Sequence, residues 1–305
     1  MVMNEPKNAP VPVAHPQCGH FSMSISPAVE RFAAFAIGSR GGNPAGVVIV
    51  GTLPPPEAML AIAANVGYSE TVFAAAVEDG FRVRYFSPEA EVQFCGHATL
   101  ALGAALAERY GAGIFQLTIN NARISVEGRR TSGGAWAALQ SPPTSSRAAP
   151  DALVAAALAI FSYAPEDLDP RLLPAVANAG LNHLVIALKD WSKLKAMHYN
   201  LEVGREFMRQ EGIGTVSFLY AETPQLFHAR NPFAIGGVYE DPATGAAAAA
   251  LAGLLRDRGW PHGGQIKILQ GEDMGQPCEL IADITEAAGA SIRVSGTAYR
   301  IQELG

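Results

Sequence analysis

The sequence has few cysteines, and their spacing excludes two kinds of architecture. Its three cysteines, Cys18, Cys95 and Cys278, lie far apart, and the chain has no Cys-x-x-Cys pair. Neither a disulfide framework nor a structural zinc site is therefore indicated. The first residues also lack the apolar segment of a secretory signal. We expect a protein of the reducing cytoplasm.

Long apolar runs and an excess of basic residues are also absent. No segment approaches the roughly 20 consecutive apolar residues of a membrane-spanning helix, and the Ala-rich run 246–255 ends at Arg256. The chain carries 22 Lys and Arg against 28 Asp and Glu, a formal net charge of -6. A chain of this sign has no general attraction for nucleic acid or an anionic membrane, so we expect neither as a partner.

The sequence does hold enough apolar residues for two domains. Of its 305 residues 49% are hydrophobic, and domains usually have about 100–200 residues. We predict a flexible leader over residues 1–27, where His15, Cys18 and His20 have no rigid element to arrange them around a metal. The Pro- and Ser-rich stretch 141–146 is predicted to be a linker. It separates a first domain, residues 28–143, from a second, residues 144–292, and a last strand over 293–305 could return to the first domain.

Local patterns predict strands and helices in both halves. Pro54-Pro55-Pro56 opens a helix that Gly67 ends, and Asp79-Gly80 predicts a hairpin. Further helices are predicted over 151–161, 201–208 and 246–256. The predicted strands cover 29–36, 45–50, 71–76, 81–86, 117–120, 124–127, 135–139, 183–188, 216–220, 226–229, 266–269, 279–281 and 292–301.

A Gly-His pair lies where another helix begins. The stretch Phe94-Cys95-Gly96-His97 is typical of a strand end and a tight turn, and the residues that follow are apolar on nearly every side. Such a helix is expected in a core. The free backbone N–H groups of its first turn favour an anion, and the His97 imidazole can carry a proton near neutral pH. The pair therefore predicts a site that combines anion binding with proton transfer.

A similar turn and helix occur in the second half. Glu240-Asp241-Pro242-Ala243-Thr244-Gly245 leads into an Ala- and Leu-rich helix, and Gly245 lies 149 residues after Gly96. If the halves are duplicates, two helix N-termini would face each other across an interdomain ligand site suited to an anion.

Four side chains near these turns could do chemistry, and each also has an ordinary structural explanation. Glu70 lies between a helix end and an apolar strand, so it is either a solvated turn acid or a partly desolvated general acid/base. His97 could cap a helix or serve the site, and Asp241 could simply cap the turn at Pro242. Cys95 could be a thiolate base, but its apolar neighbour Phe94 favours a small buried residue.

Five short motifs occur in an order that resembles a known family. They are Gly42-Asn43-Pro44-Ala45, Tyr68-Ser69-Glu70-Thr71, Cys95-Gly96-His97-Ala98-Thr99, Glu240-Asp241-Pro242-Ala243-Thr244-Gly245, and Gln270-Gly271 with Met274-Gly275 and Pro277. Together they resemble the phenazine-biosynthesis PhzF-like family, which is related in fold to diaminopimelate epimerase. The resemblance runs from about Val29 to the C-terminus.

The resemblance implies an α+β fold with two pseudo-symmetric domains, each a strongly curved, mostly antiparallel sheet around a central helix. It also implies a homodimer whose active site lies between the domains and uses no metal and no organic cofactor. The implied activity is that of a cofactor-independent isomerase, which shifts a proton on a small carboxylated substrate that can be cyclic.

The same resemblance implies roles for individual residues. Glu70 matches the glutamate that moves the proton in the phenazine enzyme, an isomerase of dihydro-3-hydroxyanthranilate, and His97 and Asp241 match the accompanying catalytic His and Asp. The residues that match or flank the positions binding the substrate are Ser69, Gly96, Gly245 and Ala246.

The sequence departs from the phenazine enzyme at Ala246, where that enzyme has a serine. The missing hydroxyl removes one substrate hydrogen bond, worth about 0.5–1.5 kcal/mol net, which argues against the phenazine precursor more than against the proton chemistry. Two other functions stay open. An amino-acid epimerase or racemase would use Cys95 as a base but lacks a cysteine in the second turn. A non-catalytic protein would bind a small ligand or a partner.

Overall fold

The computed structural model describes residues 27–302, so the predicted leader lies outside the described residues except for Pro27. The helices are α1 (Pro56–Val66), α2 (Gly96–Tyr110), α3 (Asp151–Ile160), α4 (Trp191–Lys195), α5 (Leu201–Glu211) and α6 (Gly245–Asp257), with 3₁₀ turns η1 (Pro165–Asp167), η2 (Ala234–Gly236) and η3 (Glu272–Met274). Among the described residues, no helix has both the length and the apolar character needed to cross a membrane.

Strands make up most of the remaining structure. In the first half they are β1 (Glu30–Ala36), β2 (Asn43–Val50), β3 (Thr71–Val77), β4 (Gly80–Phe86), β5 (Glu91–Val92), β6 (Gly113–Thr118), β7 (Arg123–Thr131), β8 (Gly134–Pro143) and β9 (Ser145–Ala148). In the second half they are β10 (Ala175–Asn178), β11 (Asn182–Ala187), β12 (Thr215–Thr223), β13 (Leu226–Arg230), β14 (Pro232–Phe233), β15 (Val238–Glu240), β16 (Gln265–Gln270), β17 (Cys278–Asp283) and β18 (Ser291–Arg300).

The strands of the first half form a closed ring around α2. Their order is β1-β2-β3-β4-β6-β7-β8-β18, and β18 pairs in turn with β1. Helix α2 packs against strands all around this ring, and every residue from His97 to Ala107 is buried. Enclosure on all sides explains why this helix is apolar on all sides.

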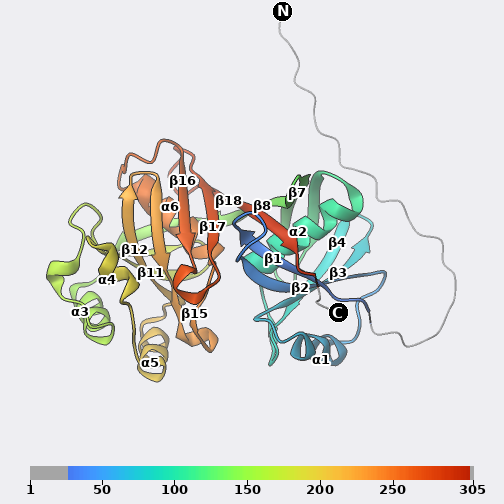
Figure 1. The fold of residues 1–305 in the computed structure, drawn as a ribbon, viewed down its shortest axis with the longest axis horizontal. Helices are drawn as coiled ribbons and strands as arrows, with labels where there is room; N and C mark the ends of the chain where they lie inside the picture. The colour runs from blue at the N-terminus through green and yellow to red at the C-terminus, as the bar shows by residue number, and fades with distance from the viewer. Residues whose placement is uncertain (1–26, 303–305) are drawn as a thin grey trace, which may run out of the picture.

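The second half repeats this order of pairings. In the first half β2 and β3 are parallel, β3 and β4 are antiparallel, and β4 and β6 are parallel, with α2 between β4 and β6 in the sequence. In the second half β11 and β12 are parallel, β12 and β13 are antiparallel, and β13 and β16 are parallel, with α6 between β13 and β16 in the sequence. Helix α6 packs against β9, β10, β11, β17 and β18. Figure 1 shows the two lobes side by side, one around α2 and the other around α6.

The stretch 141–146 is not the irregular linker that its composition predicts. Strand β8 runs through Pro143, β9 starts at Ser145, and β9 pairs with β10 of the second lobe. Prolines fit here because they lie at the end of β8, where its pairing with β18 becomes irregular between Ser291 and Arg293. The Ser141 hydroxyl accepts a hydrogen bond from the Ile292 N–H at 2.9 Å, which ties this segment to the start of β18.

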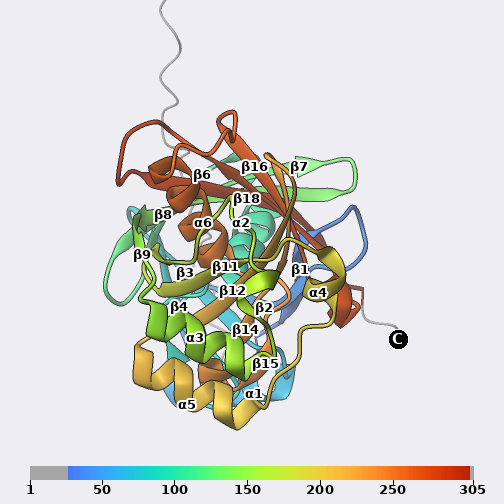
Figure 2. The same cartoon turned by 90° about the vertical axis from the view of Figure 1, so that its left-hand side faces the viewer.

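Strand β18 joins the two lobes. It pairs with β8 and β1 of the first lobe and with β17 of the second, and it runs between the lobes in Figure 1. One continuous hydrophobic core contains residues of both α2 and α6. Outer helices cover the other faces of the strands: α1 packs on β2 and β3, and α3 and α5 pack on the second lobe, where Figure 2 shows them in front. The mixed α+β class and the mostly antiparallel, curved sheet are as predicted.

Candidate active site

Glu70 lies directly before β3, and the pairing of β2 with β3 sets its position. Gly46 of β2 stands opposite Thr71 of β3, and the Gly46 N–H donates a hydrogen bond to the Glu70 carbonyl at 3.2 Å. A Cβ on Gly46 would lie 2.6 Å from the Thr71 hydroxyl, so only glycine lets the two strands approach this closely. The Glu70 side chain keeps 17% of its surface exposed, so a ligand can reach it.

His97 lies in the first turn of α2 and faces Glu70. The two side chains approach to 3.4 Å between His97 Nε2 and Glu70 Oε2. The Ser69 hydroxyl lies 3.5 Å from the same ring nitrogen. His97 is 6% exposed, so the surrounding protein encloses nearly all of its ring. Ser69, Glu70 and His97, which the sequence singled out separately, thus form one cluster.

Asp241 follows β15, and residues of both lobes hold it in place by hydrogen bonds. Its Oδ1 accepts a hydrogen bond from Asn43 Nδ2 at 2.9 Å, and its Oδ2 accepts one from the Thr244 hydroxyl at 2.5 Å. Its carbonyl accepts a hydrogen bond from Gln270 Nε2 at 2.6 Å. Burial raises the pKa of the Asp241 carboxyl; the charge of His97 opposes the rise and the charge of Glu70 adds to it. Asp241 therefore belongs to the same electrostatic unit as Glu70 and His97.

Three residues of this unit have structural roles that we had not predicted from the sequence. They are Asn43, Thr244 and Gln270, and each hydrogen-bonds to Asp241 or its loop. All three lie inside the motifs that carry the family resemblance, so the motifs were their only signal. A buried ion pair supports the same loop: Arg230 Nη2 lies 2.6 Å from Glu240 Oε2, next to Asp241 in the chain.

The two glycines at the helix starts have different surroundings. A Cβ built on Gly96 would meet no atom within 4 Å, so open space adjoins the first turn of α2. At Gly245 a Cβ would lie 3.6 Å from the Phe35 ring. Phe35 has a φ of 60°, a conformation that costs a non-glycine residue about 1–3 kcal/mol and that clusters at functional sites. Ala246 is half-buried on the first turn of α6. No contact in the structure tests the substrate-binding roles of these residues, which stay predictions.

The two described cysteines are buried thiols. Cys95 Sγ lies 3.2 Å from His97 Nδ1, and burial together with the nearby charges of Glu70 and Asp241 raises the pKa of the Cys95 thiol well above its usual range. Cys278, at the start of β17, donates to the Gln276 carbonyl at 3.1 Å, and burial raises the pKa of its thiol to about 12. Neither thiol is poised to form a thiolate near neutral pH.

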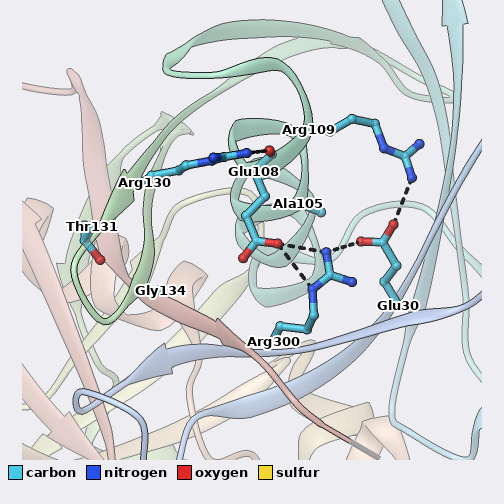
Figure 3. A pocket seen from close by; sticks show the side chains of 8 residues that line it. All are labelled: Glu30, Ala105, Glu108, Arg109, Arg130, Thr131, Gly134 and Arg300. Carbon is cyan, nitrogen blue, oxygen red and sulfur yellow. Dashed lines mark hydrogen bonds and ion pairs between the residues drawn. The ribbon is translucent and has the colours of Figure 1, made fainter.

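A surface pocket of about 420 Å³ lies elsewhere on the first lobe and has a different character. Its lining includes Glu30, Glu108, Arg109, Arg130 and Arg300. Figure 3 shows that these charges pair with one another: Arg300 contacts both glutamates, Arg109 contacts Glu30, and Arg130 donates to the Glu108 carbonyl. The pocket adjoins the C-terminal end of α2, about 16 Å along the helix from His97 at 1.5 Å per residue. The ion pairs that line this pocket hold β1, β18 and α2 together. The pocket is not part of the candidate site.

Glu70 and His97 form a cluster of ionisable side chains at the start of α2, and comparisons with known proteins define the family. The family model for phenazine biosynthesis-like proteins, PhzC-PhzF, matches residues 32–303. An uncharacterized isomerase of Deinococcus radiodurans is 33% identical over 87% of this chain and 90% of its own length. The trans-2,3-dihydro-3-hydroxyanthranilate isomerase of Pseudomonas aeruginosa is 30% identical over 86% of this chain and 91% of its own length.

Solved structures share the fold. A PhzF-family phenazine biosynthesis protein of Bacillus anthracis superposes with a TM-score of 0.79 at 22% identity, covering 90% of this chain and 96% of that one. A probable proline racemase of Agrobacterium radiobacter superposes with a TM-score of 0.61 at 10% identity, covering 91% and 92%. The chain therefore belongs to the phenazine biosynthesis-like PhzC-PhzF family, has the epimerase-like fold that its motifs imply, and is an isomerase.

Proposed function

We propose that this isomerase is cofactor-independent and that Glu70 moves a proton on a small carboxylated substrate. The approach of Glu70 Oε2 to His97 Nε2 at 3.4 Å carries the proposal. The fold brings these two side chains together from the position before β3 and from the first turn of α2. A partly exposed carboxylate beside an imidazole can take a proton from a ligand and pass it on. Glu70 is the member of the pair that a ligand can reach.

The proposed reaction conserves both protons and electrons. Glu70 takes a proton from a carbon next to an unsaturated or carboxylated centre of the substrate. The electron pair of that C–H bond joins a new double bond, the existing double bond shifts along the substrate, and the proton returns at the far end. His97 orients the Glu70 carboxylate. Asp241 holds a proton more readily than an ordinary aspartate, because burial raises its pKa, and can therefore relay the proton that Glu70 has taken back to the substrate.

The substrate carboxylate is proposed to bind between the first turns of α2 and α6. Their free N–H groups, at Gly96 and Gly245, are suited to an anion. Ala246 offers no hydroxyl there, so we propose a carboxylate other than the substrate for which the Pseudomonas aeruginosa relative is named. The domain division near residue 143 and assembly as a homodimer remain part of this proposal.

The raised pKa of the Cys95 thiol argues against the alternative of a cysteine-based racemase. A binding protein without catalysis is disfavoured because Glu70 and His97 face each other at 3.4 Å and the Asn43 side chain holds Asp241 in place.

Solvent deuterium exchange tests the proposed function. Small alicyclic and aromatic carboxylates, including trans-2,3-dihydro-3-hydroxyanthranilate, are incubated with the protein in D₂O and followed by NMR. We expect at least one to gain deuterium at a carbon position, and Glu70→Gln to slow that exchange by about 10²–10⁴-fold, the usual contribution of a general base. The exposed Glu89 provides a matched control, and Glu89→Gln should exchange at the parent rate. Unchanged exchange in Glu70→Gln would rule out the proposed role of Glu70.

A further inference from the structure

Three buried polar side chains of the second lobe form a hydrogen-bonded network that leads to Asp241. His183 Nδ1 of β11 lies 2.7 Å from the Thr215 hydroxyl of β12, and that hydroxyl donates to Asn231 Oδ1 at 3.2 Å. The Asn231 carbonyl accepts a hydrogen bond from the Asp241 N–H at 3.1 Å. Contacts thus run without a break from β11 to a residue of the candidate site. We call His183, Thr215 and Asn231 the buried network.

Stability alone does not account for the buried network. The exposed fractions of its side chains are 0% for His183, 1% for Thr215 and 0% for Asn231. His183 Nε2 and Asn231 Nδ2 have no hydrogen-bond partner among the described residues. A buried polar group without a partner lowers stability, and apolar side chains at these positions would avoid that loss. The polar residues therefore call for another explanation.

The hydrogen bonds of the network run in one direction. Asn231 Oδ1 can only accept, so the Thr215 hydroxyl donates its single proton there and must itself accept from His183. His183 therefore carries its proton on Nδ1. Burial lowers the pKa of His183 to about 4, so the ring is neutral near neutral pH.

Asn231 belongs to a short stretch that holds the Asp241 loop. Arg230 pairs with Glu240 at 2.6 Å, and Asn231 holds the neighbouring Asp241 by its backbone. The Asn231 side chain ties this stretch to Thr215 of β12. Loss of the Thr215 hydroxyl would therefore free Asn231 to shift, and Asp241 with it.

The matching place in the first lobe also adjoins a residue of the site. The pairing of β2 with β3 begins at Gly46 and Thr71, and Thr71 directly follows Glu70. The pairing of β11 with β12, which repeats it, begins at His183 and Thr215. Each lobe thus supports one member of the site from the first residue pair of matching strands.

We propose that His183 and Thr215 are positioning residues of this isomerase, which act through Asn231 to hold Asp241 where it can relay the proton that Glu70 has taken. The effect on catalysis rests on the proposed function, whereas the hydrogen-bonded network does not. Misplacing a reacting group by about 1 Å can cost about 10²-fold in rate. The network can therefore govern the rate without touching the substrate.

Nitrogen-15 NMR of the imidazole rings tests the direction of the network in the full chain. His183→Phe identifies the His183 signals by their loss. We expect a neutral ring with its proton on Nδ1 near neutral pH. A ring protonated on Nε2 would overturn the proposal, because the Thr215 hydroxyl would then turn to His183 and release Asn231.

Amide hydrogen exchange tests whether the network holds Asp241. Thr215→Val removes the hydroxyl and keeps the shape of the side chain. We expect it to speed exchange of the Asp241 N–H by about 2–10-fold, the range for loss of one neutral hydrogen bond, relative to the buried Leu251 of α6 as an internal reference for global stability. Val216→Ala is the matched control, because Val216 is fully buried on the opposite face of β12. It should leave this ratio at the parent value.

The same variants are then compared in the deuterium-exchange assay with carboxylates. Thr215→Val should slow substrate exchange by about tenfold or more, and Thr215→Ser, which restores a hydroxyl, should recover most of the rate. Val216→Ala should exchange at the parent rate. If Thr215→Val fails to fold, His183→Phe takes its place in both assays, and the ring NMR of the parent still tests the network.

The two assays distinguish the possible failures. If no carboxylate exchanges in the parent, the proposed function fails and the positioning role with it, while faster exchange of the Asp241 N–H would still show that the network holds this residue. If carboxylates exchange and Thr215→Val matches the parent, the positioning role fails and the proposed function stands.

Discussion

The hydrogen bond from Asn43 to Asp241 gives the most demanding test of how the site is assembled. It spans 198 residues of sequence and joins β2 of the first lobe to the loop before α6. Asn43 is 2% exposed, so water cannot readily replace its amide when the side chain is removed. Asn43→Ala would leave Asp241 Oδ1 without its donor.

The size of the effect follows from the charge of the acceptor. A hydrogen bond to a charged group contributes about 1.5–3 kcal/mol. Asn43 Nδ2 also reaches the Ala243 carbonyl, but at 3.4 Å, which adds little. We expect Asn43→Ala to lower the free energy of unfolding by about 1.5–3 kcal/mol at a pH where Asp241 is ionised. The exposed Asn65 of α1 is the matched control, and Asn65→Ala should change stability by no more than about 0.5 kcal/mol.

A double-mutant cycle with Asp241→Ala measures the interaction itself. Urea unfolding of the parent, both single variants and the double variant should give a coupling energy of about 1.5–3 kcal/mol, with the m-value unchanged. Effects that add within about 0.5 kcal/mol would show that the two side chains act independently. In that case the reasoning that the lobes position Asp241 through Asn43 is wrong.

Three further predictions concern the neighbouring residues. Cys95→Ala should keep deuterium exchange within about fivefold of the parent, because the raised pKa keeps the thiol protonated and therefore unavailable as a base; complete loss would instead favour a cysteine-based epimerase. Arg230→Met leaves the buried Glu240 unpaired and should cost about 3–5 kcal/mol in urea unfolding, since the Arg230 side chain is 10% exposed and the Glu240 side chain 2%; a variant as stable as the parent would contradict this. Because burial raises the pKa of Asp241 in the folded state, its charge costs stability at neutral pH, and that cost disappears as the pH falls through the raised value toward the unfolded pKa of about 3.9. The stability of Asp241→Asn relative to the parent should therefore be greatest near neutral pH and shrink as the pH falls toward the unfolded pKa in thermal melts; a difference that grows on acidification would refute the assigned direction.

The two central helices were the most predictable part of the fold. Each begins at the glycine that its turn indicates, Gly96 for α2 and Gly245 for α6. Their apolar sequences report burial directly, because a helix surrounded by strands needs apolar side chains on every face. Short elements such as β9, β10, β14 and α4 were missed, since a few residues carry too little periodicity to distinguish a strand or helix from a loop.

The stretch 141–146 shows how tertiary pairing overrides local composition. Proline and serine are typical of a linker, yet β8 and β9 occupy this stretch because β18 and β10 offer partners at both of its ends. The repeat of 149 residues between the helix starts was visible in sequence, whereas the repeated order of strand pairings appeared only in the structure.

The residue types of the site and the helices that carry them can be predicted from the sequence, because turn chemistry and helix burial depend on near neighbours. The tertiary structure was needed to show that Glu70 faces His97, that Asn43 holds Asp241, and that Cys95 lies buried beside His97. These relations depend on the register of β2 with β3 and on the joining of the two lobes through β18. Distance, burial and pKa are properties of three-dimensional surroundings, so the same residues in another fold would carry different chemistry.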